Sequence, residues 1–96
     1  MIRVSTPDHA GSRDQAKALA AALPAELDGE TVLLDCSALV IGTPSFLDEI
    51  VKQVLVIRDA EVLEISGAPE RAGALLERAA ENRSVRERIR VALRAA

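Results

Sequence analysis

Three short runs of aliphatic residues predict three strands, at 2–5, 31–34 and 61–66. The run at 31–34 is continuously apolar, which is typical of a strand that is covered on both faces. A sheet of three strands has two open edges, and open edges favour pairing with another chain. We therefore expect either a homodimer or a surface for a protein partner.

Helical spacing of apolar residues separates these strands and continues after the last of them. The first helix is predicted to begin at Ser12, because Gln15 completes a capping box with it, and to end before Pro24. The four predicted helices span about 12–23, 46–55, 69–81 and 84–93. Alternating strands and helices of these lengths predict one small α/β layer domain over residues 1–96, which ends in a pair of helices.

The connection between the second strand and the second helix carries two signals. Leu39, Val40 and Ile41 are apolar and are predicted to be buried. The loop Gly42–Ser45 then breaks the pattern. Two N-caps fit the helix that follows: Ser45 with Asp48 three residues later, or Thr43 with Pro44 at the first helical position. The sequence leaves both arrangements open.

Composition excludes several classes of function. The 96 residues contain one aromatic side chain and carry a net charge of −3, so that a nucleic-acid partner is not expected. One cysteine and one histidine provide neither an internal disulfide nor the usual ligands of a zinc ion. The sequence contains no long apolar run of the kind found in signal peptides or membrane spans, so we expect a cytoplasmic protein without membrane insertion.

Arginine is concentrated near the C-terminus: residues 71–96 contain seven arginines and three glutamates, whereas residues 1–70 are strongly acidic. One interpretation is a basic face for an acidic partner, a lipid headgroup or a nucleic acid. The other is that the arginines pair with the acidic body of the same chain, and we favour this one.

Few residues have the setting that catalysis needs. Cys36 has no histidine near it in the sequence and is interpreted as a buried thiol, and His9 as an exposed loop residue. Asp48 and Glu49 are neighbours on one predicted helix, so their side chains point about 100° apart and do not form an acid/base pair. We therefore predict a non-enzymatic protein without a metal or cofactor.

Residues 32–50 resemble the central segment of STAS domains, which occur in anti-sigma-factor antagonists. A STAS-like group of bacterial proteins of unknown function is more similar still, because Ser45-Phe46-Leu47-Asp48-Glu49 matches its Ser-Phe-x-Asp-Glu segment. The resemblance covers about residues 31–80. It implies a STAS-like fold and a regulatory module that switches between partners, namely an ATPase-fold serine kinase or an anti-sigma factor.

The family motif Asp-Ser-Ser-Gly is not conserved in full here. Aligned without a gap, Thr43 takes the place of the aspartate, Pro44 that of the phosphorylated serine, and Ser45 that of the second serine. Proline has no hydroxyl, so Ser45 and Thr43 are the candidate phosphorylation sites. The predicted partner-binding residues are Thr43, Ser45, Asp48, Glu49 and Lys52. As an alternative, some STAS domains are small cytoplasmic subunits of lipid-transporting membrane complexes, which the arginine-rich segment would face.

Overall fold

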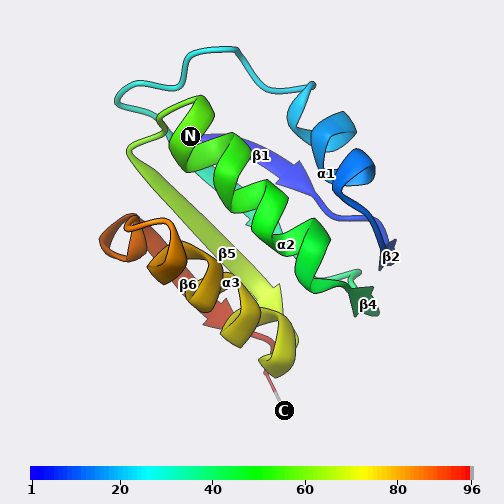
Figure 1. Ribbon diagram of the computed structural model, residues 1–96. Helices are drawn as coiled ribbons and strands as arrows, with labels where there is room; N and C mark the ends of the chain where they lie inside the picture. The colour runs from blue at the N-terminus through cyan, green and yellow to red at the C-terminus, as the bar shows by residue number, and fades with distance from the viewer. Residues whose placement is uncertain (96) are drawn as a thin grey trace.

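The computed structural model describes residues 1–95 and contains a four-stranded sheet in which every neighbouring pair of strands is parallel. The strands lie in the order β1-β3-β5-β6 (Figure 1). Their bounds are Ile2–Ser5 for β1, Thr31–Asp35 for β3, Val62–Ala68 for β5 and Ile89–Leu93 for β6. A separate parallel pair joins β2 (His9–Ala10) to β4 (Ile41–Gly42).

Helices connect successive strands of the sheet. They are α1 (Arg13–Ala20), α2 (Pro44–Val51) and α3 (Glu70–Asn82). A π-helical segment (Lys52–Ile57) extends α2, and a short 3-10 turn (Arg86–Arg88) precedes β6. The prediction of an α/β layer domain with alternating strands and helices is confirmed at this level. No helix among residues 1–95 combines the length and the apolar character needed to cross a bilayer.

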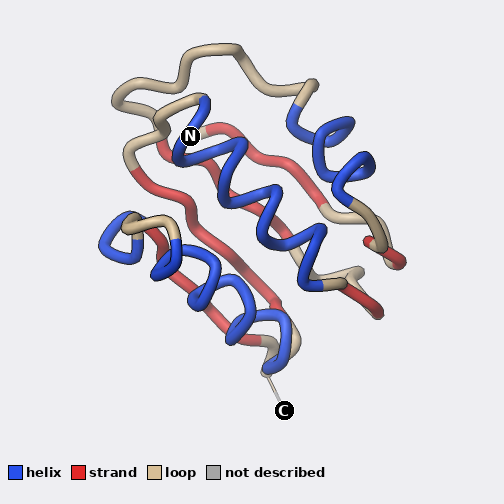
Figure 2. The backbone as a smooth tube through the Cα atoms, in the orientation of Figure 1, coloured by secondary structure: helices blue, strands red, loops and turns tan. Residues whose placement is uncertain are grey.

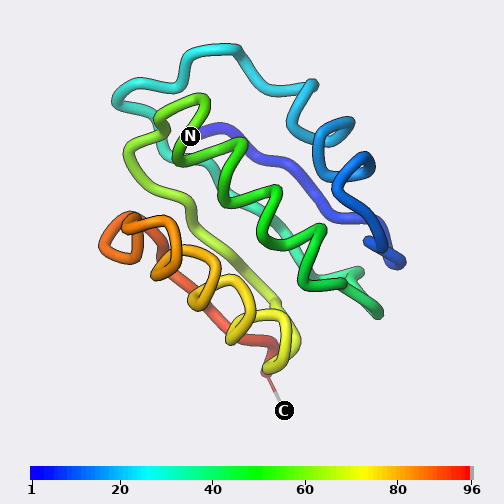
Figure 3. Tube along the Cα trace, in the orientation of Figure 1, coloured from blue at the N-terminus to red at the C-terminus, as the bar shows by residue number. Residues whose placement is uncertain are grey.

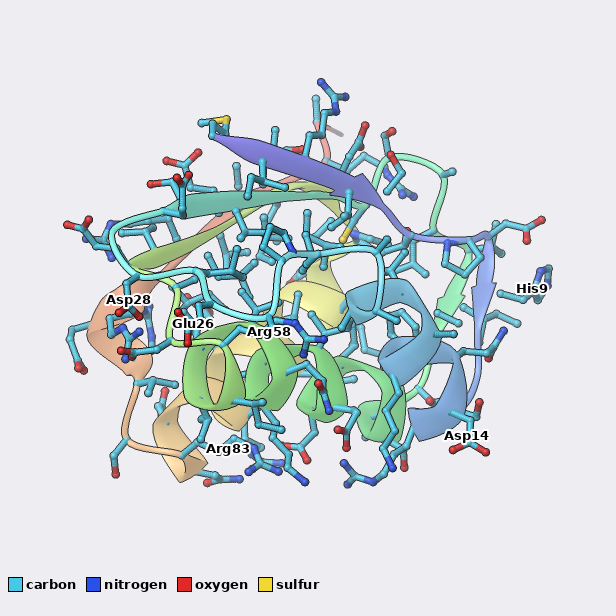
Figure 4. All side chains as sticks on the ribbon, turned by 90° about the horizontal axis from the view of Figure 1, so that it is seen from above. His9, Asp14, Glu26, Asp28, Arg58 and Arg83 are labelled. Carbon is cyan, nitrogen blue, oxygen red and sulfur yellow. The ribbon has the colours of Figure 1, made fainter. Side chains whose placement is uncertain are left out.

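All three helices cover the same face of the sheet, as Figures 2 and 4 show. Burial alternates accordingly along the inner strands: Val32 and Leu34 are buried, whereas Leu33 between them is only partly buried. The prediction that this strand is covered on both faces is therefore wrong. Leu33 lies in register between Arg3 and Glu64, and long charged side chains such as these can shield an apolar neighbour with their stems.

The predicted pair of C-terminal helices is also wrong, because only α3 is helical and a fourth strand follows it. The helix ends at Asn82, where a break was predicted, but residues 89–93 form β6 at the edge of the sheet. The aliphatic residues Ile89, Val91 and Leu93 alternate with Arg90 and Ala92, which is the period of a strand. Pairing with β5 decides between this period and the helical one.

The helix caps follow the sequence signals. The Ser12 hydroxyl oxygen accepts a hydrogen bond from the Gln15 amide at 3.1 Å, and the Gln15 side chain accepts one from the Gly11 amide at 2.6 Å. For α2, the cap is Thr43, whose hydroxyl oxygen accepts from the Phe46 amide at 3.2 Å while Pro44 occupies the first turn. The structure thus selects the second of the two predicted arrangements.

Candidate functional site

The candidate site lies where the chain leaves β3 and enters α2. Parallel strands bring the loops at their carboxyl ends to one end of the sheet. This end also carries β2, β4 and the start of α3 (Figure 1). The segment of interest is 36–45, which includes the turn after β3, the short strand β4 and the cap of α2.

Val40 and Ile41 are exposed at this end of the sheet, with relative accessibilities of 67% and 52%. They were predicted to be buried together with Leu39, but only Leu39 is. Both of their backbone amides donate to the carbonyl oxygen of Asp8, at 2.8 and 3.0 Å. The loop therefore extends away from the main sheet toward β2, and no helix or strand of residues 1–95 covers the two side chains. Two adjacent exposed aliphatic residues are the first feature of a contact surface.

Arg94, which directly follows the edge strand β6, holds this loop in place. Its Nη2 donates to the carbonyl oxygens of Cys36, Ser37 and Leu39 at 3.0, 3.2 and 2.9 Å. Its Nε donates to the carbonyl oxygen of Gly67 at 3.2 Å. A guanidinium presents its donors in a rigid fork, so one side chain fixes several carbonyl groups of the turn before Val40.

Asp35 anchors the start of the same turn. One carboxylate oxygen accepts from the Ser37 amide at 2.9 Å, and the other pairs with Arg3 at 2.6 Å. The hydrogen bonds from Ser37, followed by the ion pair with Arg3, lower the pKa of Asp35 to about 2. Because this pKa lies below that of an unfolded aspartate, ionised Asp35 stabilises the folded state.

This lowered pKa predicts a specific sensitivity to acid. The stabilising effect of Asp35 should be fully present above about pH 5 and be lost as the pH falls toward 2. We expect the urea midpoint of the Asp35→Asn variant to fall less between pH 6 and pH 3 than that of the wild type. The control is Glu30→Gln, which neutralises an exposed carboxylate at the opposite end of β3 from Asp35. Equal losses in all three proteins would contradict the assignment.

The two candidate phosphorylation sites differ in their surroundings. Thr43 is half-buried and its hydroxyl oxygen is engaged as the cap of α2, whereas Ser45 is exposed in the first turn of the helix. Of the two hydroxyl groups, that of Ser45 is the more accessible to a modifying enzyme.

The other predicted binding residues are less free than expected. Asp48 pairs with Arg83 at 2.8 Å and with Arg13 at 2.9 Å, and Lys52 is half-buried. The side chain of Glu49 is only 2% exposed, so its prediction as part of an exposed helix face is wrong. Its carboxylate accepts from Arg13 at 3.2 Å and from Gln53 at 2.8 Å. Packing of α1 on this side of α2 explains the burial, because α1 brings Arg13 over both carboxylates.

These contacts keep both carboxylates ionised. The pKa of Asp48 is lowered chiefly by its hydrogen bonds to Arg83 and then by Arg13, although partial burial opposes this. Burial also opposes ionisation of Glu49, but hydrogen bonds from Gln53 and Arg13 outweigh it and hold the pKa of Glu49 below its usual value. Arg83 and Arg13 engage the oxygens of Asp48, and Arg13 and Gln53 engage those of Glu49, so neither group has the setting of a general acid or base at neutral pH.

The two remaining candidate residues have the predicted burial, although His9 lies in β2 and not in a loop. Cys36 is fully buried, and burial raises the pKa of its thiol to about 11, whereas the His9 side chain is exposed beside Asp8. Within residues 1–95, no three histidine, cysteine or acidic side chains are grouped so as to hold a metal ion.

Two C-terminal arginines pair with acidic residues of segment 1–70, as the interpretation we favoured predicts, and a third pairs within the C-terminal segment itself. Besides Arg83 with Asp48, the ion pairs are Arg86 with Glu77 at 2.7 Å and Arg88 with Asp59 at 2.9 Å. Arg83 follows α3 directly, and Arg86 and Arg88 lie in the 3-10 turn before β6. In the part of the chain that the structure describes, Arg71 and Arg78 on α3 make neither an ion pair nor a hydrogen bond through their side chains.

Comparison with known proteins identifies no relative of this chain. No protein-family model, no curated protein and no solved structure matches the chain.

Proposed function

We propose that this protein is a non-enzymatic regulatory module that binds a protein partner through the loop before α2. The observation that carries the proposal is the exposed pair Val40 and Ile41, which lies on a firmly held loop four residues before the exposed Ser45 in the sequence. Aliphatic side chains held in one conformation lose little entropy on binding, and are therefore suited to anchor an interface.

Phosphorylation of Ser45 would make such an interface switchable. A phosphate in the first turn of α2 is compatible with the helix, because the free amides and dipole of a helix N-terminus favour negative charge. The modification would add up to about two negative charges beside the apolar pair. A partner that packs against Val40 and Ile41 would then meet a charged, strongly hydrated group, and its affinity would change.

The resemblance to anti-sigma-factor antagonists suggests the class of the partner, which is an ATPase-fold serine kinase or an anti-sigma factor. The proposed contact comprises Val40 and Ile41 together with Thr43, Ser45 and the accessible part of Asp48 and Lys52. The engaged state of the carboxylates and the buried Cys36 thiol support a binding role over a catalytic one.

The proposal is tested by affinity purification of the tagged protein from its native cells, followed by mass spectrometry. The test variant is Val40→Ser/Ile41→Ser, and its matched control is Val56→Ser/Ile57→Ser, which removes a similarly exposed apolar pair elsewhere. We expect a kinase or anti-sigma factor with the wild type and the control, and at least about tenfold less of it with the test variant. The same spectra would show phosphate on Ser45 or Thr43. Equal recovery with all three proteins would refute the proposed contact.

The alternative, a subunit of a lipid-transporting membrane complex, would be favoured by recovery of membrane-transport proteins in the same experiment. It depends on arginines that are free to face a partner or anionic lipid. The internal ion pairs of Arg83, Arg86 and Arg88 leave fewer of them free, so we prefer the switch.

A further inference from the structure

A groove of about 230 Å³ adjoins the exposed apolar pair. It separates the loop that contains β4 from the first turn of α3, two segments that lie at the same end of the sheet (Figure 3). One wall contains Val40, Ile41 and Gly42, and the other contains Pro69, Arg71 and Ala72.

The backbone of β4 is open toward this groove. Ile41 and Thr43 direct their amides to β2, where they donate to the carbonyl oxygens of Asp8 and Ala10 at 3.0 and 2.9 Å. From Ile41 onward the chain pairs with β2 as a regular strand, in which consecutive residues direct these groups to opposite sides, so the amide and carbonyl of Gly42, between Ile41 and Thr43, point away from β2. Figure 1 shows β2 and the start of α3 on opposite sides of β4. The free edge of the strand therefore faces the groove.

The charge of the groove is positive. Arg71 lines it and is exposed, and no acidic side chain of the described residues pairs with it. Its neighbour Glu70 lines a different groove, which α3 forms with Val91 and Leu93 of β6. Charge complementarity therefore favours an occupant with a negative group next to Arg71.

We infer that the groove binds an extended segment of the partner protein, which pairs with the free edge of β4. One apolar side chain of this segment packs on Val40 and Ile41, and a carboxylate next to it pairs with Arg71. This mode of binding combines backbone hydrogen bonds for affinity with side-chain contacts for selectivity. The inference deepens the proposed function, since it uses the same apolar pair and specifies what the partner presents to it.

The test starts with selection of short random peptides displayed on phage against the wild-type protein. We expect enrichment of sequences in which aliphatic residues adjoin aspartate or glutamate. Titration of a selected peptide should show binding weakened at least about tenfold by Val40→Ser/Ile41→Ser and by Arg71→Glu. Val56→Ser/Ile57→Ser and Arg78→Glu should bind like the wild type, because Arg78 is an equally exposed arginine of α3 that lines a different groove. Hydrogen exchange of the Gly42 amide should slow in the complex.

Two results would overturn the inference. One is that no selected peptide loses affinity on Val40→Ser/Ile41→Ser, and the other is that Arg71→Glu and Arg78→Glu have equal effects. Selection of basic peptides, or unchanged exchange at Gly42, would also count against it. These failures are distinct from failure of the proposed function: a co-purified partner that depends on Val40, Ile41 or Ser45 but not on Arg71 would preserve the module and exclude only this mode of binding.

Discussion

Replacement of Phe46 by alanine should lower the free energy of unfolding by about 3–5 kcal/mol. Phe46 is fully buried and is the only aromatic residue of the chain. Its replacement by alanine therefore removes the one aromatic ring from the core and leaves a cavity there. Phe46 also lies in the first turn of α2, where its amide takes part in the cap with Thr43. Loss of the side chain therefore affects the helix that carries the candidate site.

The measurement is urea unfolding followed by far-ultraviolet circular dichroism, since the protein has no tryptophan. Phe46→Leu is the matched control, because it retains most of the apolar volume and should cost clearly less. A domain of this size is stabilised by about 5–10 kcal/mol, so the alanine variant should lose about a third or more of its free energy of unfolding. A loss below about 1.5 kcal/mol would show that Phe46 is not central to the core.

The second large effect is expected at Gly67, near the end of β5. Its φ angle is +66°, a conformation that costs residues with a side chain about 1–2 kcal/mol. A Cβ atom there would also lie 3.2 Å from the Cα atom of Ser37, which belongs to the turn that Arg94 fixes. We expect Gly67→Ala to lower the free energy of unfolding by about 2 kcal/mol or more.

Gly29 provides the matched control for this substitution. Its φ angle is +74°, but a Cβ atom would meet no other atom within 4 Å. Gly29→Ala should therefore report the backbone cost alone, about 1 kcal/mol. The difference between the two variants measures the contact with Ser37. Equal losses in urea unfolding would show that the turn moves aside without cost.

Local signals allowed much of the fold to be predicted. The cap of α1 depends on Ser12 and Gln15, which are three residues apart, and the sequence therefore specified it. The cap of α2 was ambiguous because two hydroxyl residues have suitable spacing, and only the folded backbone selects Thr43. In each case the relevant interactions are within one turn of helix.

The wrong predictions concern positions whose structure depends on residues that are distant in the sequence. Ile89 belongs to a helical and to an alternating pattern at once, and only pairing with β5 decides that it lies in a strand. Glu49 follows the spacing of an exposed helix face, but Arg13 and the packing of α1 bury it from 36 positions away. For Val40 and Ile41, the aliphatic character suggested burial, whereas both side chains are exposed where the loop extends away from the main sheet. No local pattern carries this information.

Arg94 makes the loop before α2 and the edge strand β6 one energetic unit. Its backbone amide donates to Ala68 at 2.7 Å within the sheet, while its side chain binds three carbonyl groups of the loop. Coupling of this kind is reciprocal, so a ligand that binds only the loop conformation held by Arg94 also strengthens attachment of β6. By the same linkage, a chain that pairs with the open edge of β6 would alter affinity at Val40 and Ile41 without touching them. Self-association and partner binding would then compete or cooperate through a single guanidinium group.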